Sequence, residues 1–341
     1  MSEATILRMK EKKWGVMVHL LEGIQNDPEH DANENIGKTS WDELIDSIDV
    51  EEIARELHEM GAGWFLITIM QGAKYMIAPN KTYDKLTGFQ PGEACSKRDL
   101  PLDLYEALKK YDIDLYLYYT GDGPHKDEQA GNGLGWYDGD PNGKKECFYQ
   151  NWTSVLKEYA ERYKGKVKGW WIDGCYSYHG YNDNILKIYD DAIKSADENY
   201  IVAYNDGAAI NKVWEGPKSL RYDINNGDEQ RIDVTLCRCS IYDDFLAGEA
   251  LDFNMLPTGN EDCQWHILSP LSGVGDWGCG WAFDGVKYSV GYFAKYLKEV
   301  LTKGGVVTVE MGLRRSGKFF DCQYKFMKDV KEFFNDLEDK K

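Results

Sequence analysis

One segment of the sequence places a carboxylate at the end of a strongly apolar run. Residues 169–174 read Gly-Trp-Trp-Ile-Asp-Gly, and side chains alternate along a strand, so Trp171 and Asp173 are predicted to face the same side. A carboxylate at the carboxyl end of a buried strand is costly unless it is hydrogen-bonded or used in chemistry. Asp173 is therefore the first candidate for catalysis, and the alternative is that it caps a helix or fixes a loop.

Aromatic residues gather near the predicted ends of the same strands. Sugar rings have apolar faces that stack on indoles, so a carboxylate surrounded by tryptophan suits a carbohydrate. The alternative, expected for most of these rings, is that they fill the core. His19 ends the first apolar run and is the histidine best placed to reach such a pocket, although a lone histidine there is more often a core residue. The aromatic residues are Trp14, Tyr118, Tyr119, Trp170, Trp171, Trp214, Trp265, Trp277 and Trp281.

Short apolar runs alternate with amphipathic helical patterns along the whole chain. Runs that are apolar at nearly every position are typical of parallel strands buried on both faces. About eight repeats predict an α/β protein with a single TIM-like (β/α)8 barrel domain spanning residues 1–341. A nucleotide-binding sheet would show the same alternation, but no G-x-G-x-x-G motif follows the first predicted strand, and the sequence contains no Walker A motif. The predicted strands are 14–20, 64–70, 114–120, 168–174, 200–206, 219–224, 263–268 and 305–312, and the predicted helices are 50–60, 102–110, 151–163, 184–196, 286–302 and 322–337.

Composition and charge argue against several kinds of partner. The 341 residues include 40 basic and 58 acidic side chains, a formal net charge of −18. That charge repels phosphate backbones and anionic lipids, so we expect neither nucleic acid nor a membrane as a partner. No apolar run reaches the roughly 20 residues of a spanning helix, and the sequence as given shows no secretory signal, so a cytoplasmic protein is expected. Assembly as a homo-oligomer is left open.

Six segments follow one another in an order and spacing that resemble a known family. They are 14–19, 117–120, 171–174, 205–207, 277–281 and 301–312. Together they are similar to the catalytic domain of the α-L-fucosidases of glycoside hydrolase family 29. The resemblance implies a retaining glycosidase that hydrolyses a terminal α-L-fucoside or a related glycoside through a covalent glycosyl-aspartate. It implies Asp173 as the nucleophile, and it places at the sugar the residues His19, Tyr119, Trp171, Asn205 and Trp281.

The sequence departs from the family pattern in three places. Residues 70–75 read Met-Gln-Gly-Ala-Lys-Tyr, where the family has Lys-His-His-Asp-Gly-Phe with two sugar-binding histidines. Gly207 stands where the family has an arginine, and the family's C-terminal β-sandwich has no counterpart in this sequence. Buried contacts to hydroxyls set specificity strongly. The alternatives are therefore a barrel with altered sugar specificity or a non-catalytic carbohydrate-binding barrel.

A retaining glycosidase needs a second carboxylate about 5–5.5 Å from the nucleophile, to protonate the leaving oxygen. The spacing beyond Asn205, taken with the family pattern, favours Glu229 as this acid/base. Glu215 is the next candidate, and three others stay open: Asp228, Glu249 and Glu261.

The expected mechanism uses carboxylates alone, so no cofactor and no metal are predicted. A barrel metalloenzyme using His19, His179 or His266 is the remaining alternative, but the sequence shows no spaced set of ligands. Residues 138–142 copy the start of a calcium-binding loop, and Tyr149 stands where that loop requires a glutamate.

Overall fold

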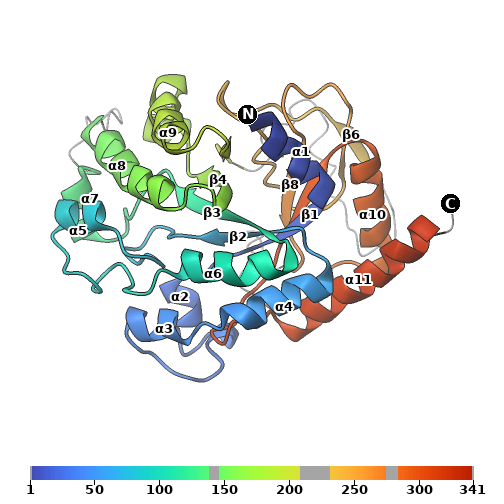
Figure 1. The fold of residues 1–341 in the computed structure, drawn as a ribbon, viewed down its shortest axis with the longest axis horizontal. Helices are drawn as coiled ribbons and strands as arrows, with labels where there is room; N and C mark the ends of the chain where they lie inside the picture. Colours follow the sequence, from blue (N-terminus) through green and yellow to red (C-terminus); the bar gives the residue numbers. More distant parts are fainter. Residues whose placement is uncertain (1, 138–145, 208–230, 274–282, 340–341) are drawn as a thin grey trace.

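A computed structural model describes residues 2–137, 146–207, 231–273 and 283–339. Seven of the described strands form one curled sheet in the order β5-β4-β3-β2-β1-β9-β8, and every neighbouring pair is parallel (Figure 1). The strands are β1 (Trp14–Val18), β2 (Trp64–Thr68), β3 (Asp114–Thr120), β4 (Val167–Asp173), β5 (Ile201–Tyr204), β8 (His266–Pro270) and β9 (Val306–Glu310); a separate pair is formed by β6 (Ile232–Val234) and β7 (Met255–Pro257).

Helices follow the strands in the alternation that the sequence predicts. The helix α4 has the predicted bounds because both its ends are marked: the Asp49 side chain accepts hydrogen bonds from the N–H groups of Glu51 and Glu52, and Gly61 ends the helix in the left-handed conformation. The α-helices are α1 (Ser2–Lys12), α2 (Glu22–Gln25), α3 (Trp41–Ser47), α4 (Val50–Met60), α5 (Lys81–Thr87), α6 (Leu100–Leu108), α7 (Glu128–Leu134), α8 (Glu146–Arg162), α9 (Asp183–Ala196), α10 (Val290–Thr302) and α11 (Asp321–Asp339); the 3-10 helices are η1 (Asp31–Asn33), η2 (Lys109–Tyr111) and η3 (Ser177–His179).

The predicted α/β class is confirmed, with a curled parallel sheet that is barrel-like. Eight strands and a complete barrel stay predictions, because the predicted strand 219–224 lies outside the described residues. Residues 243–250, for which the sequence predicts no strand, run between the two edge strands. The N–H of Asp244 donates to the carbonyl of Val202 in β5 (2.8 Å), and the N–H of Ala250 donates to the carbonyl of Leu268 in β8 (2.8 Å).

The concave side of the sheet holds its own apolar core. Alternate strand residues point to this side, and α1 covers it at the amino ends of the strands. The Thr5 hydroxyl of α1 donates to the carbonyl of Asn199 (2.8 Å), and the Arg8 guanidinium binds the Asp114 carboxylate (2.6 Å). The inner core consists of Met9, Met17, Trp64, Leu66, Tyr116, Tyr118, Trp171, Ile201, Ala203, Phe245, Ala247, Leu268 and Val306. One end of the sheet is thus closed, and the carboxyl ends of the strands remain to carry a site.

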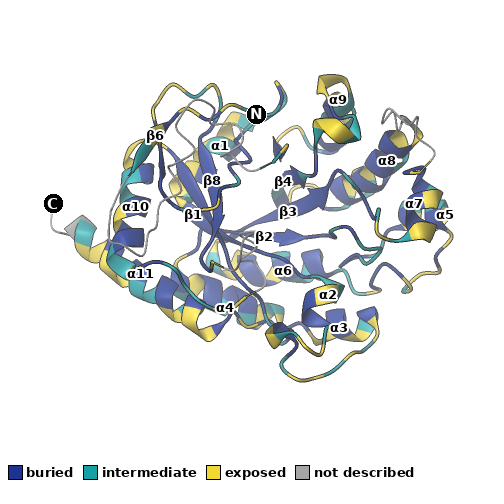
Figure 2. Cartoon of the chain, turned by 180° about the vertical axis from the view of Figure 1, so that it is seen from behind, coloured by how far each residue is buried: buried dark blue, intermediate teal, exposed yellow. Residues whose placement is uncertain are grey.

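A second, larger core lies between the convex side of the sheet and the surrounding helices. The strands are buried on both faces, whereas the helices are buried on one face and exposed on the other (Figure 2). Side chains of the opposite strand parity, such as Val16, Phe65 and Trp170, fill this layer. This arrangement explains why the strands read as continuous apolar runs.

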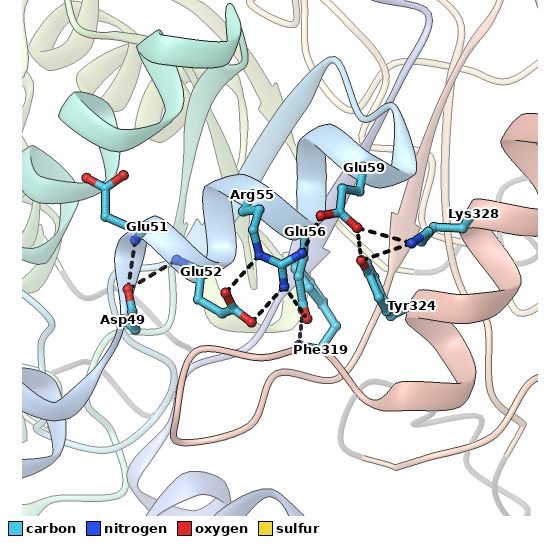
Figure 3. A network of polar contacts seen from close by, with 9 residues as sticks. All are labelled: Asp49, Glu51, Glu52, Arg55, Glu56, Glu59, Phe319, Tyr324 and Lys328. Carbon is cyan, nitrogen blue, oxygen red and sulfur yellow. Dashed lines mark hydrogen bonds and ion pairs between the residues drawn. The ribbon is translucent and has the colours of Figure 1, made fainter.

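Polar contacts join α4 to α11 on the outside of the helical layer (Figure 3). The Glu56 carboxylate accepts a hydrogen bond from the N–H of Phe319 (2.8 Å). Glu59 accepts hydrogen bonds from the Tyr324 hydroxyl and from the Lys328 ammonium, the latter at 3.1 Å, and also pairs with Arg55. The Tyr324 hydroxyl is the main cause that lowers the pKa of Glu59 to about 2. The last helix is therefore tied to the first half of the chain.

Candidate active site

Six polar or charged side chains lie together at the carboxyl ends of the strands. The register pairs Tyr118 of β3 with Trp171 of β4 and Thr120 with Asp173, so these four residues share the concave face. As the sequence indicated, Trp171 and Asp173 point the same way. The candidate site consists of His19, Tyr118, Asp173, Asn205, Glu249 and Glu310.

Asp173 is held by donors on both of its carboxylate oxygens. The Tyr118 hydroxyl donates to Oδ2 (2.6 Å), and the Asn205 side-chain amide donates to Oδ1 (2.7 Å). Burial raises the pKa of Asp173 above its usual value, and these two hydrogen bonds, with that of the Gly174 N–H, oppose the rise because they favour the ionised form. Part of the Asp173 residue surface remains exposed, so a ligand can reach it.

The Asn205 amide joins Asp173 to a second carboxylate. Its Nδ2 also donates to Oε2 of Glu249 (2.7 Å), and its Oδ1 accepts from the N–H of Gly207 (3.2 Å), which fixes which end of the amide faces the acids. Asp173 Oδ1 and Glu249 Oε2 each lie 2.7 Å from Asn205 Nδ2, so these two oxygens are at most twice that distance apart. A separation of about 5–5.5 Å between two carboxyl groups is the geometry of a nucleophile and an acid/base in a retaining glycosidase.

Glu249 reaches this place because of the irregular segment that runs beside β8. Gly248 has a φ of +65°, and a Cβ there would lie 2.0 Å from the carbonyl oxygen of His266. Only glycine fits both the conformation and the close approach. The turn at this glycine places Glu249, which bridges to Leu268, at the carboxyl end of the segment. Sequence reasoning kept Glu249 only as a remote alternative; the alternation of Phe245, Ala247 and Glu249 was the signal available.

A buried pair of polar side chains, His19 and Glu310, lies beside Tyr118. His19 Nε2 is 3.0 Å from Oε1 of Glu310, and both side chains are at most 7% exposed. The His19 ring meets the Tyr118 ring edge-on, with centroids 5.4 Å apart. Sequence reasoning placed His19 at the site but missed Glu310, although this glutamate ends β9 just as Asp173 ends β4. The site therefore offers a histidine–glutamate pair beside the two carboxylates.

Two predicted sugar-binding aromatic residues are buried. The Trp171 ring stacks on Tyr118 with centroids 5.5 Å apart, and its indole N–H donates to the carbonyl of Ala247 (3.0 Å), so it supports the site from below. Tyr119 points to the convex side of the sheet, where its hydroxyl donates to the carbonyl of Trp152 (3.0 Å). The structure brings Tyr118, not Tyr119, to Asp173, because successive strand residues face opposite sides.

The remaining predicted residues fall elsewhere. Glu261 accepts from the N–H of Thr258 (2.8 Å) in a turn. His266 binds the Leu246 carbonyl and the Thr308 hydroxyl inside the inner core, and burial lowers the pKa of its imidazole to about 4. Outside the described residues lie Glu215, Asp228, Glu229, Trp281 and residues 138–142.

Within the described ranges, no three histidine, cysteine, aspartate or glutamate side chains are grouped as a metal site would require. No helix in the part of the chain that the structure covers is long and apolar enough to cross a membrane. The cytoplasmic location, the assembly state, the lack of a cofactor and the single domain stay predictions.

Comparison with known proteins identifies the fold. No protein-family profile matches the chain, and no curated protein matches it in sequence. Among solved structures it resembles an endo-fucoidan hydrolase from glycoside hydrolase family 107, with a TM-score of 0.64, 14% identity, and 95% of this chain and 92% of the other covered. A mutant of the α-L-fucosidase AlfC gives a TM-score of 0.59 at 15% identity over 99% of both chains. A family 29 α-L-fucosidase from Bacteroides thetaiotaomicron gives 0.59 at 15% identity, over 97% of this chain and 73% of the other. The chain shares the fold of these glycoside hydrolases.

Proposed function

We propose that the chain is a retaining glycoside hydrolase that acts on an α-L-fucoside or a related glycoside. The observation that carries this proposal is the Asn205 amide, whose nitrogen lies 2.7 Å from the carboxylates of both Asp173 and Glu249. This spacing fits a nucleophile paired with an acid/base. The names of the structural neighbours, an endo-fucoidan hydrolase and α-L-fucosidases, favour fucose as the sugar.

In the proposed reaction, Asp173 attacks the anomeric carbon while Glu249 gives a proton to the leaving oxygen. A glycosyl ester on Asp173 results, and the aglycone departs with the proton. Glu249 then takes a proton from water, which attacks the same carbon and frees Asp173 and the sugar. Asn205 acts as a positioning residue that holds the two carboxylates at this spacing. No metal or cofactor takes part in these steps.

Glu249 replaces Glu229 as our first choice of acid/base, because Glu249 lies in contact with the Asn205 amide. Glu229 remains the alternative that the sequence favours. For the sugar hydroxyls we propose the pair His19 and Glu310, whose polar atoms lie beside Tyr118. Trp281 stays a proposed stacking residue.

We further propose that residues 243–250 complete a (β/α)8 barrel between β5 and β8. Their backbone hydrogen bonds to Val202 and Leu268 support this, since one strand is bonded on each side. In such a barrel, catalytic residues come from the carboxyl ends of several strands. Asp173 and Glu249 would meet for that reason.

Leaving-group dependence tests the proposal and assigns the acid/base. Glu249→Ala should hydrolyse substrates with good leaving groups almost normally and those with poor ones very slowly, because only the latter need protonation. Azide should restore part of the rate by attacking the glycosyl-enzyme without general-base help. The matched variant Glu229→Ala should respond evenly to all leaving groups.

Asp173→Ala is the second half of the same test. It should lose several orders of magnitude in turnover with every leaving group, because a covalent step has no substitute nucleophile. Normal turnover by a folded Asp173→Ala protein would refute the proposed function. A steep leaving-group response in Glu229→Ala, with Glu249→Ala unaffected, would give the acid/base role to Glu229. A wild-type protein that binds sugars without hydrolysing any would be the non-catalytic barrel.

A further inference from the structure

A pair of stacked tyrosine rings follows the strand that carries Asp173 and reaches the surface. The rings of Tyr176 and Tyr178 stack with centroids 5.0 Å apart and planes 12° from parallel. Tyr176 follows Asp173 by three residues and is partly buried, whereas Tyr178 is 72% exposed. Among the described residues, no other large apolar side chain is as exposed. We refer to these two rings as the tyrosine stack.

The inner end of the tyrosine stack lies within electrostatic reach of the proposed catalytic carboxylates. Burial raises the pKa of the Tyr176 hydroxyl, and the charges of Asp173 and then Glu249 add to the rise. For Tyr178, burial also raises the pKa, with smaller contributions from Asp122 and Asp173. Because η3 follows the carboxyl end of β4, which Asp173 forms, a ligand that leaves Asp173 along η3 would extend over these rings.

The backbone that carries the tyrosine stack is fixed by its neighbours. The N–H of His179 donates to the carbonyl of Tyr176 (2.9 Å), and the Tyr149 hydroxyl donates to the carbonyl of His179. The His179 ring packs edge-on against Trp136, with centroids 5.0 Å apart, and Trp136 is only 8% exposed. A surface that is already ordered binds without a large ordering cost.

We propose that the tyrosine stack binds the sugar on the leaving side of the scissile bond, and that this sugar is an uncharged hexopyranose. This inference rests on the proposed function, because it takes Asp173 as the point of attack. The carbon–hydrogen face of a pyranose covers an exposed aromatic ring such as Tyr178. The Asp122 carboxylate lies against the backbone between Asp173 and the rings, where a Cβ built on Gly174 would be 3.2 Å from Asp122 Oδ1, and its charge disfavours a sulfated or acidic sugar. The substrate would thus be a neutral fucosylated oligosaccharide rather than a simple fucoside.

Two substrates separate binding at the tyrosine stack from the chemistry. An α-L-fucosyl hexose disaccharide has a leaving sugar, whereas α-L-fucosyl fluoride leaves a single atom. Tyr178→Ala should lower kcat/KM for the disaccharide about tenfold and leave that for the fluoride unchanged. Tyr178→Phe, which keeps the ring, should retain wild-type values on both. The control Phe333→Ala removes another partly exposed ring, on α11, and should change neither.

The outcomes distinguish this inference from the proposed function. If the wild type hydrolyses the fluoride and Tyr178→Ala affects both substrates equally or neither, the tyrosine stack is not the leaving-side site. If the wild type hydrolyses neither substrate, the proposed activity on α-L-fucosides fails, and calorimetric titration with the disaccharide decides about the stack. Binding that Tyr178→Ala weakens about tenfold would support it; absent or unaffected binding would refute it. Equal binding of a sulfated disaccharide would refute the choice of an uncharged sugar.

Discussion

The Tyr118 hydroxyl allows a quantitative test of how Asp173 stays ionised. Tyr118→Phe removes the O–H group that donates to Asp173 Oδ2 at 2.6 Å and keeps the ring that stacks on Trp171. A hydrogen bond to a charged group contributes about 1.5–3 kcal/mol, and 1.36 kcal/mol corresponds to one pKa unit. Because Asp173 is only partly buried, we take the lower end of the range. The pKa of Asp173 should then rise by about one unit in the variant.

The pH dependence of kcat/KM, measured from about pH 4 to 8, reports this change because it follows the ionisation of the free enzyme. The nucleophile works as the carboxylate, so the acid limb of the profile should move to higher pH by about one unit. Tyr116→Phe is the matched control. Its hydroxyl lies one layer below, where no described group is within hydrogen-bonding distance, so its profile should not move. An acid limb that stays in place in Tyr118→Phe, or moves equally in both variants, would refute the reasoning.

Three further predictions concern stability and metal dependence. Asp173→Asn should raise Tm near neutral pH. The pKa of Asp173 is raised on folding, so the wild-type protein loses stability as the pH rises through that pKa, and the asparagine variant does not. In thermal melts the gain should vanish at acidic pH, and a gain that persists there would contradict this reasoning. Activity should survive a chelator, and a loss that a divalent ion reverses would redirect attention to residues 138–142. Tyr324→Phe should lower the free energy of unfolding by about 1 kcal/mol in urea melts at neutral pH. That loss should fade as the pH falls from 4.5 towards 2, where Glu59 becomes protonated, and a constant loss would exclude Glu59 as its cause.

The sequence predicted the sheet well because its signals are local. Strands buried on both faces leave unbroken apolar runs, and β3 was predicted with its observed bounds. Capping residues define helix ends within a few positions, which explains the agreement over α4. Asp173 could be found for the same reason, since a carboxylate that ends an apolar strand stands out without knowledge of any partner.

The rest of the site depends on contacts between distant segments. Glu249 follows a left-handed glycine in an irregular segment, where the short alternation of Phe245, Ala247 and Glu249 is too brief to predict a strand. The choice between Tyr118 and Tyr119 needs the register between β3 and β4, which pairs Tyr118 with Trp171. Glu310 could have been predicted, because β9 ends in a carboxylate as β4 does. The sequence offered no means to see that Asn205 lies between two acids rather than only against a sugar.

The helix that closes the amino ends of the strands has a consequence for folding. α1 precedes all seven strands of the sheet in the chain, yet Thr5 donates to the carbonyl of Asn199, 194 residues later, and Arg8 binds Asp114, 106 residues later. Contacts between such distant residues form slowly, because the intervening chain must first be ordered. The apolar side of α1, including Met9, therefore cannot be fully buried until β5 has been synthesised. We expect α1 to be among the last of the described helices to dock, and hydrogen exchange during refolding should show its protection appearing late.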